Sequence, residues 1–493
     1  MLLLSFLVAC APAGVKLDDT AGLVDSEDSG VDSGDSAETA DSDSGEPDSG
    51  DSGDSGETAE TGETAGTPAE VSDLNASIHP EIGSIVVLTW TQAGTGAVYA
   101  EFSVDDGAWL STPTYTLGDG AQRLLLLGAP YDHDVTWRLV VDGTAVADDA
   151  SIHTDDPPRG VPLPDDVEGA LSDPETPYLL LSMAPGGGSG SPDDAWTFIL
   201  DARARLVWAL AAPDSRTTFM PMVAVTGDEI LIDHNSWWGA FDGGVASQVA
   251  RVDIEGSENG RYDTPGLIHP FVQKGDGSIV WGASLGSGRQ GESLDILDPD
   301  GTHRTLWDCN SYARARNETV CGSNALYWDE ETDDVLFSLY SAETIMQITP
   351  EGTVARSFGH MRDAWGWSAG SDEFYWHHGA QFLPDGHLMV SSRLTENAEE
   401  TVVREYRLDE EREELVEVWS FGEDEGVWAY IMGEPHRLPG GDTLHNYGST
   451  PRLREATPDG EVVWDVSWDD GGSLGRMTPL TSLYPLWGAA PGR

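Results

Sequence analysis

The chain has 493 residues, with 87 acidic residues against 25 Lys and Arg and a formal net charge of −62 at pH 7. This length allows two or three domains, each with a core of its own. So acidic a chain lacks the basic surface that general nucleic-acid binding requires. We therefore expect no nucleic acid among its partners.

The first ten residues, MLLLSFLVAC, form a short apolar run that ends in Ala9 and Cys10. Small residues before a cysteine are typical of a lipoprotein signal peptide. We expect residues 1–10 to be that peptide and Cys10 to be lipidated in an exported protein, on either side of the outer membrane. No other stretch reaches eighteen consecutive apolar residues, so the lipid is the only membrane attachment we expect.

Residues 11–71 are mostly Asp, Ser, Gly, Glu, Thr and Ala, as in DSGDSGDSGETAETGETAG, without an aromatic residue. Such a segment buries too little apolar surface to fold and repels itself, which predicts a disordered linker. Calcium binding is an alternative, but the ligand order of an EF-hand loop is absent.

Residues 72–158 contain alternating apolar runs such as IVVLTWTQ and DVTWRLVV, separated by Gly and Asp turns. This pattern predicts a small β-sandwich of the fibronectin type III kind. The proline-rich segment DDPPRGVPLPDD then marks a domain boundary.

Residues 165–489 repeat a two-part pattern about every fifty residues, which is typical of propeller blades. The first part is a turn followed by an apolar strand, expected to be the inner strand of a blade: TGDEILI, GDGSIV, TDDVLF, LPDGHLMV and LPGGDTLHNY. The second part is an outer hairpin, as in DILDPDGTHRTLW and REATPDGEVVWDV. The prediction is an all-β protein whose main domain is a six-bladed β-propeller.

Cys309 and Cys321 are twelve residues apart in a chain that we expect to be exported. An even pair in an oxidising compartment predicts a disulfide that closes a loop. No histidine stands near them at ligand spacing, so we predict no metal site there.

Histidines recur shortly before the predicted inner strands, at His269, at the pair His377 and His378, and at His436. Loops of different blades converge at one end of a propeller, so these side chains are expected to meet there. A neutral imidazole near pH 7 is a nucleophile, a base or a ligand. The alternative is that each histidine satisfies a carbonyl group at a blade end.

Several segments, in order, resemble the bacterial aryl-sulfate sulfotransferase family: WHHGAQFLPDGHLMVSSR, EYRLD, VWSFG, LPGGDTLHNYG, EATPDGEVVW and TPLTSLYPLWG. The resemblance implies a β-sandwich followed by a six-bladed propeller. It also implies transfer of a sulfuryl group from a phenolic sulfate ester to a phenolic acceptor through a sulfated histidine. The family uses neither a phosphoadenosine cofactor nor a metal, so we expect no cofactor.

On this resemblance His378 is the nucleophile, and His269, Arg393 and His436 are its supporting residues. An arginine suits the sulfuryl oxygens because its planar group offers paired donors and stays charged. A second register instead makes His377 and Arg393 the helpers and His436 the nucleophile. The alternative for Arg393 is a surface ion pair with an acidic neighbour such as Glu396 or Glu405, without a role in the site.

The family's helper motif consists of His, any residue, Asn, and an Arg some sixteen residues later. Asn324 matches the motif, but Gly322 replaces the His and Tyr340 replaces the Arg. These departures favour a rival function, a non-catalytic propeller that binds a ligand or a partner. A quinone-dependent dehydrogenase is a third alternative, weakened because such propellers usually have more blades and a tryptophan repeat.

Residues Asp233, His234 and Asn235 follow a predicted strand and precede Trp237 and Trp238. They are expected to line the opposite end of the channel, to form an aromatic wall for a phenolic ring, or to pack within a blade.

Overall fold

The computed structural model describes residues 69–184, 195–213, 216–236, 244–284, 292–316, 321–469 and 471–491. The predicted signal peptide with Cys10, nearly all of the linker, and Trp237 and Trp238 lie outside these residues. Within them, no helix is long and apolar enough to cross a membrane. The regular secondary structure of the described part is almost entirely β-strand, as predicted.

The N-terminal strands form two antiparallel sheets. One sheet contains β1 (Glu70–Ile78), β2 (Val86–Ala93) and β6 (Gly120–Leu126). The other contains β3 (Gly96–Val104), β4 (Trp109–Ser111), β5 (Tyr115–Leu117), β7 (Asp134–Val141), β8 (Thr144–Ala145) and β9 (Ala150–His153). Apolar residues that alternate along these strands, such as Leu124 and Leu139, are buried. The first strand begins at Glu70, two residues before the predicted boundary at 72.

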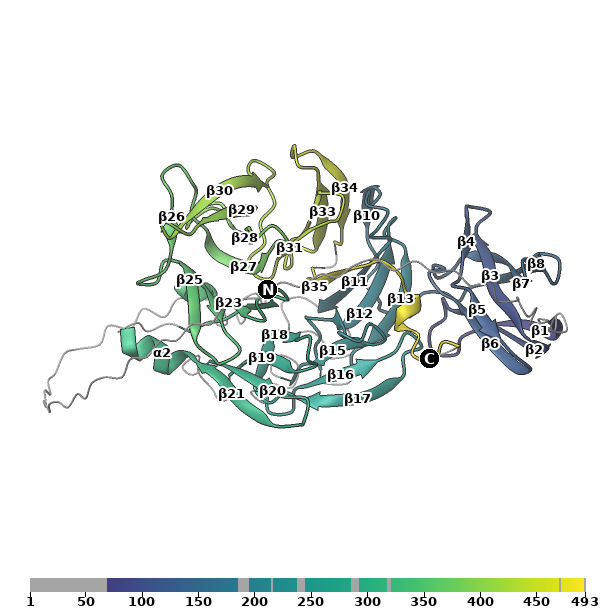
Figure 1. Ribbon diagram of the computed structural model, residues 1–493. Helices are drawn as coiled ribbons and strands as arrows, with labels where there is room; N and C mark the ends of the chain where they lie inside the picture. Colours follow the sequence, from purple (N-terminus) through teal and green to yellow (C-terminus); the bar gives the residue numbers. More distant parts are fainter. Residues whose placement is uncertain are drawn as a thin grey trace, which may run out of the picture. The chain divides into compact units, whose positions relative to one another are not determined.

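The later strands form sheets that follow one another along the chain, in the manner of a β-propeller (Figure 1). The first three contain β11 (Tyr178–Ala184), β12 (Trp196–Asp201), β13 (Leu206–Ala211) and β35 (Ser473–Leu480); β14 (Met222–Val223), β15 (Ile230–His234), β16 (Gln248–Val252) and β17 (Glu258–Asp263); and β18 (Leu267–Gln273), β19 (Ile279–Ala283), β20 (Ser293–Leu297) and β21 (His303–Asp308).

The next three sheets contain β22 (Ala325–Trp328), β23 (Val335–Leu339), β24 (Thr344–Ile348) and β25 (Val354–Gly359); β26 (Gly366–Trp367), β27 (Tyr375–Phe382), β28 (Leu388–Arg393), β29 (Thr401–Asp409) and β30 (Glu414–Phe421); and β31 (Glu434–Arg437), β32 (Thr443–Asn446), β33 (Arg452–Ala456), β34 (Val462–Ser467) and β10 (Asp166–Gly169). The short helices are α2 (Cys309–Arg316), η3 (Tyr340–Ala342) and η4 (Tyr484–Leu486). The pairing within each sheet is antiparallel, apart from the parallel pair β26 and β30.

One edge strand of each of these sheets faces the middle of the assembly. We call β14, β18, β22, β27, β31 and β35 the inner-edge strands. Contacts join β18 to β22, β22 to β27, β27 to β31 and β14 to β35, and Figure 1 shows β18, β27, β31 and β35 coming together. The space that they surround is called the channel below.

The turn-and-strand repeats found in the sequence are real strands, but their predicted place was wrong. TGDEILI, GDGSIV, TDDVLF, LPDGHLMV and LPGGDTLHNY form β15, β19, β23, β28 and β32. Each of these strands pairs on both sides, so it is the second strand of its sheet. The preceding strand takes the inner edge of each sheet, and in β18, β27 and β31 it carries a histidine. The predicted outer hairpins are confirmed, for example β20 with β21 and β33 with β34.

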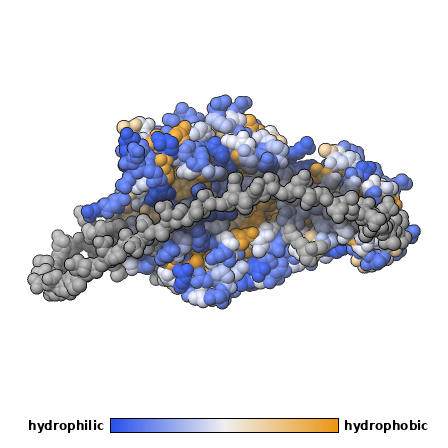
Figure 2. Space-filling view, in the orientation of Figure 1, coloured by the Kyte–Doolittle hydropathy of each residue, from blue (hydrophilic) through white to orange (hydrophobic). Residues whose placement is uncertain are grey.

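Buried apolar side chains fill the space between neighbouring sheets, such as Trp281, Phe337 and Trp464. On the face shown in Figure 2, hydrophilic residues cover most of the described surface, as the acidic composition requires.

Candidate functional site

The predicted histidines lie on the inner-edge strands and not in loops before them. His269 is in β18, His378 in β27 and His436 in β31. The prediction of loop histidines at a channel mouth was therefore wrong. They stand inside the channel because the repeat contains one more strand, on the inner side, than the turn pattern indicated.

A small pocket opens between the inner-edge strands, and we call it the channel pocket. Its polar side chains are His378, Glu434 and Arg476. The full lining is Met220, Ala325, His378, Gly379, Met432, Gly433, Glu434, Gly475 and Arg476. Glycine at 379, 433 and 475 lets neighbouring strands approach closely; a Cβ at Gly379, for example, would lie 2.7 Å from the Gly433 carbonyl oxygen.

His378 is the pocket residue best suited to react. Its Nδ1 lies 3.2 Å from the carbonyl oxygen of Gly433, and because a carbonyl only accepts, Nδ1 carries the proton. Burial lowers the pKa of His378 to about 4, although Glu434 favours the charged form. The imidazole is therefore neutral at pH 7, and its Nε2 holds a lone pair.

His269, in β18 of the third sheet, lies beside His378, in β27 of the fifth sheet. The two rings stack with centroids 6.0 Å apart and an interplanar angle of 17°. Nε2 of His269 donates to the carbonyl oxygen of Asn324 at 2.9 Å. Burial, and then the nearby His378, lower the pKa of His269 to about 3. Two neutral imidazoles thus share the channel wall.

Asn324, predicted from the helper motif, holds two strands together. Its Nδ2 donates to the carbonyl oxygen of His377 at 2.7 Å, and its Oδ1 accepts from the Ser338 hydroxyl at 2.7 Å. The amide therefore joins the fourth sheet to β27 and does not line the pocket. It fixes the strand that presents His378.

Arg476, in β35, is one of two polar pocket residues that sequence reasoning missed, and Glu434 is the other. Its guanidinium donates to the carbonyl oxygens of Phe271 at 3.0 Å and Leu326 at 2.8 Å. Its Nε lies 3.5 Å from Oε1 of Glu434. One buried arginine thus contacts β18, β22 and β31. The sequence patterns predicted no strand at residues 473–480, so nothing in them placed Arg476 at the inner edge.

Glu434 forms the acidic side of the pocket, and His436 lies behind it. Burial raises the pKa of Glu434, but Arg476 and His436 outweigh burial and lower it to about 2. Nε2 of His436 lies 3.5 Å from Oε2 of Glu434. His436 is therefore a neighbour of Glu434 and is not part of the pocket lining.

Arg393 does not line the channel pocket, so its predicted support of His378 is not seen. Its strand position pairs with Tyr375, whereas Ser391 pairs with His378. The guanidinium carbon lies 5.0 Å from the ring centre of Trp376 and 5.7 Å from that of Trp428. These are cation–π distances. No ion pair joins Arg393 to another described residue, so the predicted surface pairing is not seen either.

The residues of the second register, with His377 as helper, do not lie together in the structure. His377 is fully buried, and neither ring nitrogen has a hydrogen-bond partner among the described residues. Its ring packs against Phe374 at 4.9 Å between centroids, and burial lowers its pKa to about 3. Neighbouring residues of a strand point to opposite sides, so His377 and His378 occupy different environments.

The helper positions that depart from the family lie close together. A Cβ at Gly322 would lie 2.7 Å from the hydroxyl of Ser341. A histidine there would therefore require a shift of η3. Tyr340, the residue at the expected arginine position, lies 6.3 Å from Trp376 between ring centres.

Cys309 and Cys321 form the predicted disulfide, with Cα atoms 6.0 Å apart. It encloses α2 and ends three residues before Asn324. The disulfide thus restrains the segment that leads into β22, where the pocket residue Ala325 lies.

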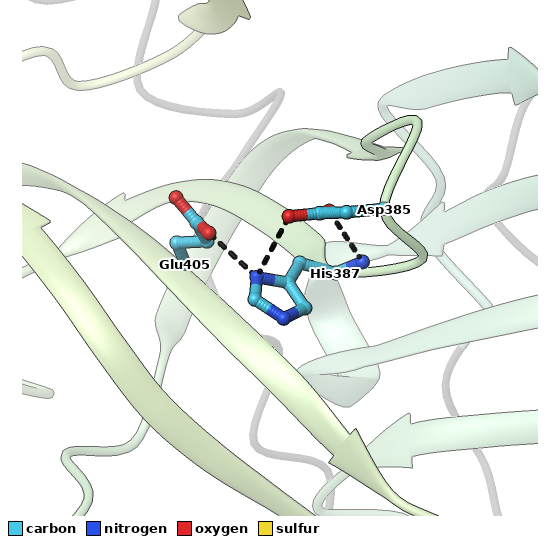
Figure 3. Close-up of side chains that lie close together, drawn as sticks. All are labelled: Asp385, His387 and Glu405. Carbon is cyan, nitrogen blue, oxygen red and sulfur yellow. Dashed lines mark hydrogen bonds and ion pairs between the residues drawn. The ribbon is translucent and has the colours of Figure 1, made fainter. Parts of the chain in front are cut away.

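One group among the described residues has the spacing of metal ligands: Asp385, His387 and Glu405 (Figure 3). Both carboxylates approach the same nitrogen, Nδ1 of His387, with Glu405 at 2.6 Å and Asp385 at 3.4 Å. Arg437 binds the other oxygen of Glu405. We call these four residues the outer bridge. Their charges already satisfy one another, and they contribute no residue to the pocket.

No family model and no curated protein matches this chain. Among solved structures, one similar protein is a protein of unknown function from Bacteroides caccae, 14% identical with a TM-score of 0.42. That match covers 62% of this chain and 100% of the other. The periplasmic gluconolactonase of Pseudomonas aeruginosa is 14% identical, with 61% and 98% covered and a TM-score of 0.38. A streptogramin B lyase is 12% identical, with 64% and 98% covered and a TM-score of 0.34. With TM-scores below 0.5, these likenesses carry no argument about this chain.

Proposed function

We propose that the sheets from residue 165 to 489 are the blades of a closed six-bladed β-propeller. Support comes from the two ends of the domain. The last strand, β35, completes the first sheet by pairing with β11, and β10 completes the last sheet by pairing with β34. Such shared sheets join the ends of a ring. The two sheets of residues 72–158 are proposed to be a fibronectin type III-like sandwich.

We further propose that the channel pocket transfers a sulfuryl group from a phenolic sulfate ester to a phenol. One observation carries the proposal: His378 is neutral, has its lone pair on Nε2, and shares a pocket with the buried guanidinium of Arg476. In the transfer, Nε2 attacks sulfur and an N–S bond forms. The ester O–S bond breaks, and the phenolate leaves with its electron pair. A second phenol then attacks sulfur, the N–S bond breaks with its electron pair returning to Nε2, and the departed phenolate or water accepts the proton of the second phenol.

In this reaction the groups around His378 have separate roles. Arg476 supplies the positive charge that the family's helper motif lacks here, and a charged donor stabilises oxyanions. His269 holds the ring of His378 by stacking. The reaction needs neither a metal nor a phosphoadenosine cofactor.

A second candidate is a channel that binds a ligand without transforming it. Two observations favour it: the two Nη atoms of Arg476 already bind carbonyl groups, and Glu434 brings a negative charge beside the position of an anionic substrate. For either function we propose an exported lipoprotein, anchored through Cys10 at the outer membrane.

The test measures nitrophenolate release from 4-nitrophenyl sulfate, with and without phenol, by the purified protein. The variants are His378→Ala and a matched control, His387→Ala, which removes a histidine of the outer bridge. We expect release that depends on phenol, survives His387→Ala, and disappears in His378→Ala. No release by folded protein with several phenols would reject the transferase and leave the binding function.

A further inference from the structure

A buried carboxylate stands next to the channel pocket without a cationic partner. Asp233 lies in β15 with its side chain fully buried, and no described Lys, Arg or His forms an ion pair with it. Burying a charge is costly unless hydrogen bonds or an opposite charge compensate. Burial raises the pKa of Asp233 to about 7, against the effect of its hydrogen bonds. Burying this carboxyl group without a countercharge lowers the stability of the fold, which points to a role for Asp233.

The side-chain hydrogen bonds of Asp233 all hold one short segment, residues 218–220. Its Oδ1 accepts from the backbone N–H of Phe219 at 2.9 Å and of Met220 at 2.8 Å. The Thr218 hydroxyl donates to the same oxygen at 3.1 Å. This segment precedes β14 and belongs to no strand. The carboxylate of Asp233 therefore takes the place of the backbone hydrogen bonds that a neighbouring strand would provide.

The segment that Asp233 holds is a wall of the channel pocket. Met220 lines the pocket. The Phe219 carbonyl accepts the backbone N–H of Arg476, and a Cβ at Gly475 would collide with that carbonyl oxygen. The Phe219 ring meets the ring of His269 edge-on, 6.4 Å away. Residues 218–220 therefore touch both Arg476 and His269.

The equivalent positions of the other second strands show that a charge is not needed for packing. The fourth residue is Asp233 in β15, and the corresponding residues are Gly282 in β19, Ser338 in β23, Ser391 in β28 and Asn446 in β32. All four are small or neutral, and Asn446 joins its sheet to the next with an amide that donates to the Gly475 carbonyl at 2.5 Å. Only the strand beside the 218–220 wall has a carboxylate.

We propose that Asp233 is a positioning residue of the channel pocket: its carboxylate holds residues 218–220 and, through them, Arg476 and His269. The effect on catalysis rests on the proposed function, whereas the effect on the wall does not. The test is therefore made without turnover, so that the two ideas fail separately.

The first measurement is amide hydrogen exchange of the full-length protein, read by mass spectrometry. We expect Asp233→Asn to speed exchange in peptides covering 216–222 and 473–478 about tenfold, because hydrogen bonds to a charged acceptor are lost. Asp334→Asn is the matched control, since Asp334 is also a buried carboxylate, bonded to Gln347 at 2.7 Å in another sheet. It should leave both peptides unchanged.

The second measurement is the rate at which diethyl pyrocarbonate modifies His378, followed from pH 5.5 to 8.5. His378 itself titrates near pH 4, so a step near pH 7 reports the carboxyl group of Asp233. We expect the step in the wild-type protein and in Asp334→Asn, and its loss in Asp233→Asn. General loosening of the fold would raise the rate at every pH and would not remove a step.

Unchanged exchange in both peptides, equal acceleration over all propeller peptides, or a step that persists in Asp233→Asn would each overturn the proposal. Should Asp233→Asn not fold, Asp233→Ser takes its place, since serine stands at two equivalent positions. Failure of both variants to fold would assign Asp233 to folding and would also overturn it.

Discussion

The channel pocket and the outer bridge are built from the same kinds of side chain: histidine, carboxylate and arginine. In the pocket, Nδ1 of His378 donates to a carbonyl group, and the carboxylate of Glu434 pairs with Arg476. In the outer bridge, Nδ1 of His387 faces two carboxylates (Figure 3). The first imidazole keeps a lone pair for chemistry, whereas the second is held between acidic groups. Both regions contain a histidine, and they differ in the group that Nδ1 of that histidine contacts.

The largest expected difference between the two regions concerns their arginines. Arg476→Met removes two hydrogen bonds to strand carbonyls and leaves Glu434 without its countercharge. We expect a loss of about 3 kcal/mol in the free energy of unfolding, measured by urea denaturation. Arg437→Met in the outer bridge is the matched control and should cost about 1 kcal/mol. Equal losses would remove the distinction between the regions.

Acid is the next way to test the neutral histidines of the interior. Burial lowers the pKa values of His269, His377, His378 and His445 to about 3 or 4. The unfolded chain binds these protons below about pH 6.5, but the folded chain does not. Their contribution to stability is therefore present above pH 6.5 and is lost as the pH falls toward 4.

Asp233 acts in the opposite direction. Its raised pKa means that the folded state keeps a proton between about pH 4 and 7, which favours folding at low pH and loses that effect as pH rises through 7. Burial also lowers the pKa of His234 to about 4, so five histidines oppose Asp233, and the urea midpoint should be lower at pH 5 than at pH 7. Asp233→Asn should steepen this fall. A midpoint that is unchanged or higher at pH 5 would contradict the neutral interior.

The smallest effect is expected from His387→Gln in the outer bridge. Its imidazole is partly exposed, so the loss should stay near or below 1 kcal/mol. The rate of diethyl pyrocarbonate reaction at His378 should not change. We also expect no rise in unfolding temperature when Zn²⁺ is added, because Arg437 and His387 already occupy the carboxylates. A clear rise that His387→Gln abolishes would make the outer bridge a metal site.

The local elements of this protein follow from its sequence because short-range rules govern them. The turn in LPDGHLMV, with Gly386 at a positive φ, precedes a strand as predicted. The outer hairpins and the disulfide between Cys309 and Cys321 were likewise predictable from pattern and spacing. Even the recurrence of histidine at one topological position was a sound signal. What local pattern missed was the extra strand at the inner edge of each sheet.

The composition of the site was harder to predict than its location. Arg393 was chosen for its distance from His378 along the chain, but a side chain at the end of β28 lies between two tryptophans. Arg476 was passed over because it is almost one hundred residues from His378. The number of residues between two positions predicts which way their side chains point only when the strands between them are regular. β27 has register shifts on both sides of His378.

The sequence by itself therefore determined the turns, the strands that follow them, the repeat of sheets and the disulfide, since each depends on neighbours in the chain. Only the tertiary structure decided which groups share the pocket. Pairing of β35 with β11 brings Arg476 to the middle, and Asp233 reaches residues 218–220 across a sheet. Such contacts depend on where strands distant in the sequence pack, and local residue patterns do not predict them.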